Sequence, residues 1–410
     1  MFVLDMIQTL ALAGVVIFLG YGIRKILPPL SRYNLPAPVI GGLVIAVIQL
    51  AARSLGAHPF TFDTSLQAPL MTAFFTSIGF GSSLSLFRTG GPRILSFFII
   101  TIIFALLQNA VGIGVALPLG QHPLFGVLNS SVTLVGGPAT GLAFAPLFET
   151  AGVHGAATVA VASAMTGIIC GGLIGAPIGT WLIERYRLGH YHRKKNESEP
   201  AGAMAILEKQ LSDPPSEVPK GEDSESYLLL KNLVAILIAM WIGSWISKGF
   251  QALGLTLPAY IGAMFAGAAI RNLSDFTGTV VLSQRSIDDI GNVSLTLFIA
   301  MAMMTLRLWD LAGVALPMLA IVAVQVVLVG AACFWPLFRL FGKDYNAAVT
   351  CAGFCGFMLG TTANAMANMD SLVKRYGPSK QAFLVIPIVG AFFIDFANAI
   401  IITVFINILS

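Results

Sequence analysis

Two stretches of the chain gather glycine, alanine, hydroxyl and amide residues within otherwise apolar sequence. They span residues 123–152 and 344–374. Each stretch is too long for a simple loop and too polar for a helix that faces lipid. Non-helical backbone inside a membrane must be buried in protein or line an aqueous cavity, because lipid cannot satisfy its N–H and C=O groups. We therefore predict two re-entrant hairpins whose tips form a binding site.

The chemistry available at these tips suits an anion. A helix that begins at a hairpin tip offers free N–H donors and the positive end of its dipole, which favours a carboxylate. Small residues also let membrane helices pack closely, so each glycine alone has a packing alternative. The matched clusters in both stretches favour a site. The predicted substrate-binding residues are Ser130, Ser131, Thr133, Gly136, Gly137, Thr140, Gly141, Gly360, Thr361, Thr362, Asn364 and Asn368.

Asp395 is a carboxylate in the middle of an apolar run. A charge at membrane depth is costly, so such a group is usually paired, hydrated or bound to a cation. Oxygen-rich surroundings suit Na⁺, a hard cation. The alternatives are a protonated structural carboxyl for Asp395 and interhelical hydrogen bonds for the amides and hydroxyls. The residues predicted to bind Na⁺ are Asp395, Asn398, Asn109, Gln108, Asn292 and Ser294.

Other kinds of chemistry lack their motifs. The chain has no Walker motif, dinucleotide fingerprint or nucleophile elbow, which argues against ATP-driven transport, an organic cofactor and enzymatic catalysis. Its basic residues are scattered at helix ends rather than gathered in a patch, which argues against nucleic-acid binding. An ion gradient is therefore the expected energy source.

The composition indicates a lipid bilayer as the solvent. The chain is 56% hydrophobic and 10% charged, whereas soluble domains carry about 25% charged residues. Its apolar runs are about 20 residues long, the length that crosses a bilayer as a helix. We predict an all-α polytopic membrane protein. The start lacks the positive charge of a cleavable signal peptide and is expected to be the first spanning helix.

Ten spanning helices are predicted, five in each half, and each polar stretch lies between the fourth and fifth helix of its half. The predicted spans are 6–23, 36–52, 66–86, 94–117, 157–184, 228–250, 257–272, 288–306, 312–337 and 382–406.

The two halves repeat one unit. Several residues recur at one constant sequence offset: Pro36 with Pro258, Gly120 with Gly342, Thr140 with Thr362, and Gly155 with Gly377. Since five crossings is an odd number, the second unit must be inverted, as in many transporters. The predicted domains are 1–186, a linker at 187–227, and 228–410.

The distribution of positive charge fits this inverted arrangement. Basic residues concentrate at the helix ends expected inside, while the ends expected outside carry only Arg53, Lys248 and Arg307. The positive-inside rule then places both termini in the periplasm. The first hairpin enters from outside and the second from inside. The linker is polar and contains several prolines, so a cytoplasmic tether is expected.

Several long motifs resemble the bacterial sodium/glutamate symporters. They are NVSLTLFIAMAM at 292–303, LPMLA at 316–320, GPS at 377–379 with QAFLV at 381–385, GAFFID at 390–395 and QNAVGIG at 108–114. The resemblance covers nearly the whole chain apart from the linker. It implies a Na⁺-coupled glutamate importer of the bacterial inner membrane, a homodimer, and an elevator-like movement. It assigns Gly136, Gly137, Thr140 and Gly141 to the first loop motif and residues 360–368 to the second.

The first motif departs from the family pattern. That pattern runs Gly-Gly-His-Gly-Thr-Gly, and this chain has Pro138 and Ala139 in place of the histidine and the third glycine. Pro138 removes an imidazole and a backbone N–H donor, and Ala139 adopts positive φ less readily than glycine. Glutamate, aspartate or another small dicarboxylate therefore remain candidate substrates. A cation channel filtered by the hairpins and a Na⁺/H⁺ antiporter with Asp395 as proton carrier are the alternative functions.

Overall fold

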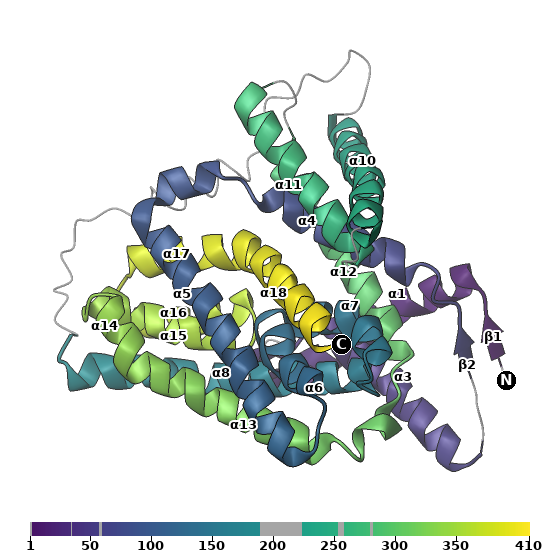
Figure 1. Ribbon diagram of the computed structural model, residues 1–410, viewed down its shortest axis with the longest axis horizontal. Helices are drawn as coiled ribbons and strands as arrows, with labels where there is room; N and C mark the ends of the chain where they lie inside the picture. Colours follow the sequence, from purple (N-terminus) through teal and green to yellow (C-terminus); the bar gives the residue numbers. More distant parts are fainter. Residues whose placement is uncertain (1, 34, 57–59, 189–223, 253–257, 279–281) are drawn as a thin grey trace.

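The computed structural model describes residues 2–33, 35–56, 60–188, 224–252, 258–278 and 282–410 (Figure 1). Most of the predicted linker therefore lies outside the described residues. The described chain is helical apart from two three-residue strands, β1 (Phe2–Leu4) and β2 (Phe60–Phe62), which pair in parallel. This small sheet, absent from the all-α prediction, ties the first helix to the segment before α4.

A helix lies at each of the ten predicted spans, and shorter helical elements stand between them, so the helical elements of each half outnumber its spans. In the first half they are α1 (Met6–Ile26), α2 (Pro28–Arg32), α3 (Ala37–Ser54), α4 (Gln67–Gly81), α5 (Ser85–Ala116), η1 (Leu117–Leu119), α6 (Pro123–Val127), η2 (Leu128–Val135), α7 (Gly137–Thr150) and α8 (Ala156–Arg185). In the second half they are α10 (Ser224–Ala252), α11 (Ala259–Thr277), α12 (Gln284–Met304), η3 (Leu308–Leu311), α13 (Ala315–Ala332), η4 (Cys333–Leu337), α14 (Phe338–Leu340), α15 (Tyr345–Met358), α16 (Thr362–Tyr376), α17 (Lys380–Ile388), η5 (Val389–Phe393) and α18 (Ile394–Leu409).

Seven helices in the described chain are long and apolar enough to cross a bilayer. These spans are Met6–Ile26, Ala37–Ser54, Pro92–Leu119, Ala156–Arg185, Ser226–Ala252, Gln284–Met304 and Ala315–Leu340. The other three predicted spans are α4, which has 15 residues, α11, and the last helix, which the π-helical η5 divides. The protein is thus a polytopic helical membrane protein.

The helices form two groups, each drawn from both halves of the sequence. The first group contains α1, α3, α4, α10, α11 and α12, which lie at the top and right of Figure 1. The second group contains α5 to α8 and α13 to α18. Glycines let helices of the first group approach closely: a Cβ on Gly20 would lie 2.0 Å from the Ala37 carbonyl oxygen, and one on Gly79 would lie 2.2 Å from that of Met264.

Four glycines that pair in the sequence repeat have positive φ. Gly120 and Gly342 have φ of 69° and 113°, and Gly155 and Gly377 have φ of 69° and 111°. Positive φ suits glycine. These glycines stand at the chain reversals just before the two polar stretches and just after them. The ψ angles of Gly155 and Gly377 differ, at 22° and 170°, so the likeness within that pair is limited to φ.

Polar side chains hold α16 against α8 within the second group. Asn364 donates from Nδ2 to the Ile168 carbonyl oxygen at 2.6 Å, and Asn368 does so to that of Gly171 at 3.0 Å. Both asparagines are buried. Bonds of this kind between helices fix the lateral position of α16 and hence of the break that precedes it.

Candidate functional site

The first polar stretch is a broken helix. After α6 the chain continues as the π-helical η2, within which Asn129 and Ser130 leave helical geometry (φ −87°, ψ 16° and φ −123°, ψ −120°). The chain then turns at Gly137, whose φ is +67°, and α7 begins. A residue with a side chain is strained in that conformation, so glycine is required there.

The second polar stretch breaks more simply. Helix α15 ends at Met358 and α16 begins at Thr362, with Thr361 in an extended conformation between them. The side chain of Thr361, the N-cap residue, makes no capping hydrogen bond to α16. The N-terminal turn of a helix carries the positive end of the helix dipole and favours an anion.

The two breaks adjoin in space although more than 200 residues separate them. A Cβ on Gly137 would lie 3.5 Å from Thr361 Cγ2 and 4.0 Å from the Gly360 carbonyl oxygen. The two helix breaks therefore lie against each other in the structure.

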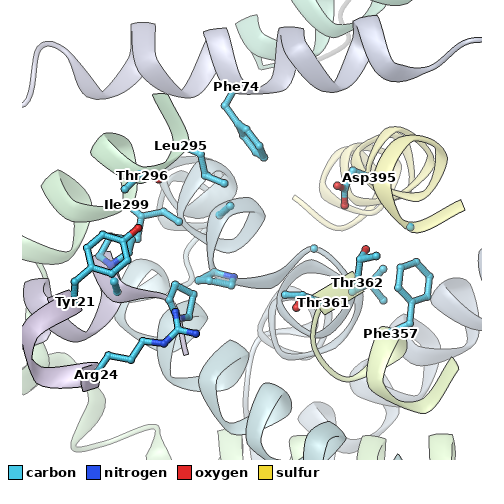
Figure 2. Close-up of a pocket in the computed structure, with 18 residues that line it drawn as sticks. Tyr21, Arg24, Phe74, Leu295, Thr296, Ile299, Phe357, Thr361, Thr362 and Asp395 are labelled. Atoms are coloured by element: carbon cyan, nitrogen blue, oxygen red, sulfur yellow. The ribbon is translucent and has the colours of Figure 1, made fainter. Parts of the chain in front are cut away.

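A cavity of about 370 Å³ opens beside the paired breaks. One wall comes from the second helix group and includes Gly136, Pro138 and Thr362. The opposite wall comes from α1, α3, α4 and α12 of the first group (Figure 2). Its volume lies in the range of about 300–1,000 Å³ that small-molecule sites occupy.

Two charged residues, Arg24 of α1 and Asp395 of α18, are found in the described lining of this cavity. Figure 2 places them on opposite sides, with the hydroxyls of Thr361 and Thr362 on the same side as the carboxylate. Asp395 is half-buried and lies two residues after the π-helical η5. Such π-helical turns are common at functional sites.

Behind the first break lies a fully buried polar network. Ser131 donates its backbone N–H to Asn109 Oδ1 at 3.1 Å and accepts from Asn398 Nδ2 at its carbonyl oxygen at 2.9 Å. Gln325 Nε2 donates to the Gln108 carbonyl oxygen at 2.7 Å and to Ser130 Oγ at 2.8 Å. Helices α5, α13 and α18 thus all bond to the broken segment.

Four oxygens of this network, and one on Asn129 in the same broken segment, have no hydrogen-bond partner in the described chain. They are Gln108 Oε1, Asn129 Oδ1, Ser131 Oγ, Gln325 Oε1 and Asn398 Oδ1. Each amide among them donates a hydrogen bond from its NH₂ group to a backbone carbonyl oxygen, at 2.7 to 3.0 Å. This bond fixes the orientation of the amide, so its oxygen is the atom left without a partner in the described chain. We call these five residues the buried amide cluster.

An unsatisfied buried polar atom costs about 1–3 kcal/mol, so five such oxygens at the first break favour a bound water or cation as their partner. Oxygen ligands of this kind suit a hard monovalent cation. The residues present therefore fit an alkali ion.

The model of a known family, the sodium/glutamate symporters, matches residues 2–378. The chain belongs to this family. The sodium/glutamate symporter of Escherichia coli K12 is 38% identical over 99% of this chain and 98% of its own length. That of Haemophilus influenzae is 36% identical over 96% of this chain and 95% of its own length.

The cavity takes in some of the residues predicted to bind substrate, namely Gly136, Thr361 and Thr362. Gly137 and Gly360 form the contact between the breaks. The remaining predicted residues are buried among protein partners instead: Thr133 bonds Ser163, Asn364 and Asn368 bond α8, Ser130 and Ser131 join the polar network, and Thr140 and Gly141 pack in α7.

The six residues predicted to bind Na⁺ fall into separate places. Gln108 and Asn398 belong to the buried amide cluster, whereas Asn109 turns its oxygen to Ser131 and keeps an NH₂ group free. Asp395 lines the cavity. Asn292 is exposed and Ser294 is buried elsewhere on α12, so the structure brings neither to the cavity nor to the cluster.

The polar or charged cavity residues outside the predicted set are Tyr21, Arg24 and Thr296. Tyr21 and Arg24 lie in the last turns of the first spanning helix. The sequence signal at Arg24 was a basic residue at a helix end, which the positive-inside rule explains without any binding role. The available clue to a binding role was Tyr21, an aromatic residue with a hydroxyl, which lies about one helical turn before Arg24.

Proposed function

We propose that this chain is a secondary active transporter that couples Na⁺ entry to the uptake of glutamate, or a closely related acidic amino acid, across the bacterial inner membrane. The observation that carries the proposal is the cavity between two adjoining helix breaks, with unpaired buried oxygens behind one of them. Symporters of the same family, 36% to 38% identical over nearly the full chain, support the substrate and the ion.

The substrate binds in the cavity. The uncapped first turn of α16 receives its α-carboxylate through backbone N–H groups, and the hydroxyls of Thr361 and Thr362 add donors beside it. Gly136 lets the chain of the first break pass close to the substrate. Asp395, across from Arg24, is placed to pair with the substrate ammonium group.

Na⁺ binds at the buried amide cluster as a transported ion. Gln108, Gln325 and Asn398 supply amide oxygens, and Ser131 and Asn129 supply the remainder. Asn109 holds the Ser131 backbone in place rather than binding the ion. Asp395 lies one turn from Asn398 on α18, so its negative charge favours a cation in the cluster. Asn292 and Ser294 have no part in this arrangement.

The two sites are coupled through the first break. Ser131 belongs to the cluster and Ser130 bonds Gln325 of the cluster, while Gly136, five residues after Ser131, lines the cavity. An ion that orders this segment sets the position of the cavity wall and raises substrate affinity. By linkage, substrate then raises Na⁺ affinity by the same factor. Each inward positive charge contributes about 2.3 kcal/mol per 100 mV of membrane potential.

The two halves form inverted repeats, each with a re-entrant hairpin entered from the opposite side of the membrane. The matched corner glycines and the broken helices at matched positions support this topology. The second helix group carries both binding sites and moves relative to the first group. The first group stays in place, forms the other wall of the cavity and makes the homodimer contact. Both termini are periplasmic and the linker is cytoplasmic.

Uptake into liposomes with an imposed Na⁺ gradient tests this function. Labelled L-glutamate should accumulate saturably, only with Na⁺ outside, and faster when the interior is negative. L-aspartate and small dicarboxylates without an amino group should be added as competitors, because they separate an amino-acid site from a general dicarboxylate site. Uptake that ignores the Na⁺ gradient contradicts the proposal.

The same liposomes separate the alternative mechanisms. Single-channel currents that do not saturate with substrate would indicate a cation channel. Na⁺ movement that drives protons outward without acidic substrate would indicate an antiporter that uses Asp395 as its proton carrier.

A further inference from the structure

Arg24 lines the cavity and has no ion-pair partner in the described chain. The residue is half-buried. Figure 2 shows its side chain reaching from α1 into the cavity, on the side opposite Asp395. An arginine held at a cavity wall without a protein anion is well placed to bind an anionic ligand, because its planar group pairs with a carboxylate through two parallel hydrogen bonds.

The adjacent wall of the first break offers no charged group and few donors. Pro138 and Ala139 of the first break line the cavity. Proline has no N–H group to donate, and neither side chain carries a polar atom. Elsewhere the lining near α1 is largely apolar, with Pro36, Phe74 and Ile299. Arg24 is thus the cation of the described lining.

The cavity therefore offers two anion-binding points on opposite walls. One is the first turn of α16 with Thr361 and Thr362, and the other is Arg24. Asp395 supplies a negative group on the side of the threonines. A ligand with two carboxylates and one ammonium group matches this distribution of charge, whereas an amino acid with a neutral side chain leaves Arg24 unpaired in a partly buried place.

We propose that Arg24 binds the side-chain carboxylate of the substrate and sets the preference for acidic over neutral amino acids. The inference rests on the proposed function and names the residue that decides substrate class. Because α1 belongs to the first helix group, the contact joins the substrate across both groups. It exists only while the cavity faces α1.

Three variants test this role in liposome uptake. Arg24→Gln should raise the half-saturating concentration of L-glutamate about tenfold or more, since a charge-assisted hydrogen-bond pair is lost. Arg24→Lys should fall between it and the parent, because lysine keeps the charge without the two-point geometry. Lys25→Gln is the matched control: it removes the same charge from the same helix turn at an exposed position outside the cavity lining.

A binding readout separates recognition from folding. The thermal stability of purified protein in Na⁺ should rise more with L-glutamate than with L-glutamine, and Arg24→Gln should abolish that difference while the Na⁺-induced stabilisation remains. If Arg24→Gln keeps the parental preference for glutamate, or the parent itself shows no such preference, the role of Arg24 is overturned. If the parent protein shows Na⁺-driven uptake, the proposed function stands even when the role of Arg24 is overturned. If the parent protein shows no such uptake, the proposed function is wrong whatever Arg24 does.

Discussion

The two helix breaks occupy matched positions in the repeat and present different groups to the cavity. At the second break Thr361 and Thr362 reach the cavity directly. At the first break the cavity meets Gly136, Pro138 and Ala139. Ser130 Oγ accepts from Gln325 of α13, and the Ser131 backbone bonds the side chains of α5 and α18. Thr140 and Thr362 correspond in the sequence repeat, yet Thr140 is buried while Thr362 is half-exposed to the cavity.

We infer from this difference that the two breaks have separate tasks in the proposed function. The first break, with its π-helical turn and non-helical residues, lies against a buried polar network that suits an ion. The second break presents its hydroxyls and helix N-terminus to the cavity, where the proposed function places the substrate carboxylate. A symporter needs both tasks side by side, since coupling requires the two ligands to share a structural element.

Removing a cluster oxygen should give the largest effect. Asn398→Ala deletes an amide oxygen and leaves the Ser131 carbonyl without its donor. The half-activating Na⁺ concentration should rise about tenfold or more, since a buried unsatisfied group costs about 1–3 kcal/mol. The measurement is uptake of L-glutamate against Na⁺ concentration.

Asn407→Ala is the matched control for this variant. Asn407 lies on the same helix and donates to the Thr403 carbonyl oxygen at 2.8 Å, outside the cluster. Na⁺ should also stabilise the substrate-free parent against heat and should not stabilise Asn398→Ala. Equal Na⁺ dependence in both variants would refute the assignment of the ion to the cluster.

The matched threonines provide a sharper comparison with a smaller effect. Thr362→Val removes a cavity hydroxyl and should raise the half-saturating substrate concentration about three- to tenfold, in line with roughly 1 kcal/mol for one hydrogen bond. Thr140→Val should leave that value within about twofold, because Thr140 is buried in α7. Substrate titrations of uptake decide the outcome. Similar losses in the two variants would contradict the division of tasks.

A substitution at the turn of the first break should lower both the stability of the protein and its substrate uptake. Gly137→Ala and Gly120→Ala both place a side chain at nearly the same positive φ, +67° and +69°, at a cost of roughly 1–2 kcal/mol. Thermal unfolding should therefore shift by a similar amount. Only Gly137→Ala, which adjoins Thr361, should also weaken substrate uptake. An equal loss of uptake in Gly120→Ala would remove the special role of the contact between the breaks.

An exposed ion pair on α16 should give the smallest effect. Lys374 and Asp370 lie 2.8 Å apart, with side chains 76% and 51% exposed. Asp370→Asn should change stability by less than about 1 kcal/mol, as is usual for solvated pairs, and should leave uptake unchanged. A thermal melt and a single uptake assay suffice. A large loss of uptake would indicate that the far end of α16 takes part in transport.

Much of this architecture could be predicted from the sequence. Apolar runs of bilayer length located the helices, and small polar residues in apolar context located both breaks. These signals depend on local composition. Local composition is informative in a membrane protein because the bilayer allows few backbone conformations. The adjoining tips followed from the repeat.

The direction of each side chain could not be predicted in the same way. The non-helical residues Asn129 and Ser130 reset the helical phase, so spacing no longer tells which face Thr133 occupies. Asn292 and Ser294 are two positions apart on a helix and point to different sides, which composition alone does not resolve. Arg24 escaped notice because a basic residue at a helix end already has a topological explanation.

Protection of single cysteines from a thiol reagent tests the central claim most directly. Ala139→Cys and Thr361→Cys each place one thiol at the cavity, in a protein whose native cysteines are replaced by alanine. L-glutamate together with Na⁺ should slow the modification of both thiols, and neither ligand alone should do so to the same extent. Protection at only one of the two positions would contradict a shared site between the breaks.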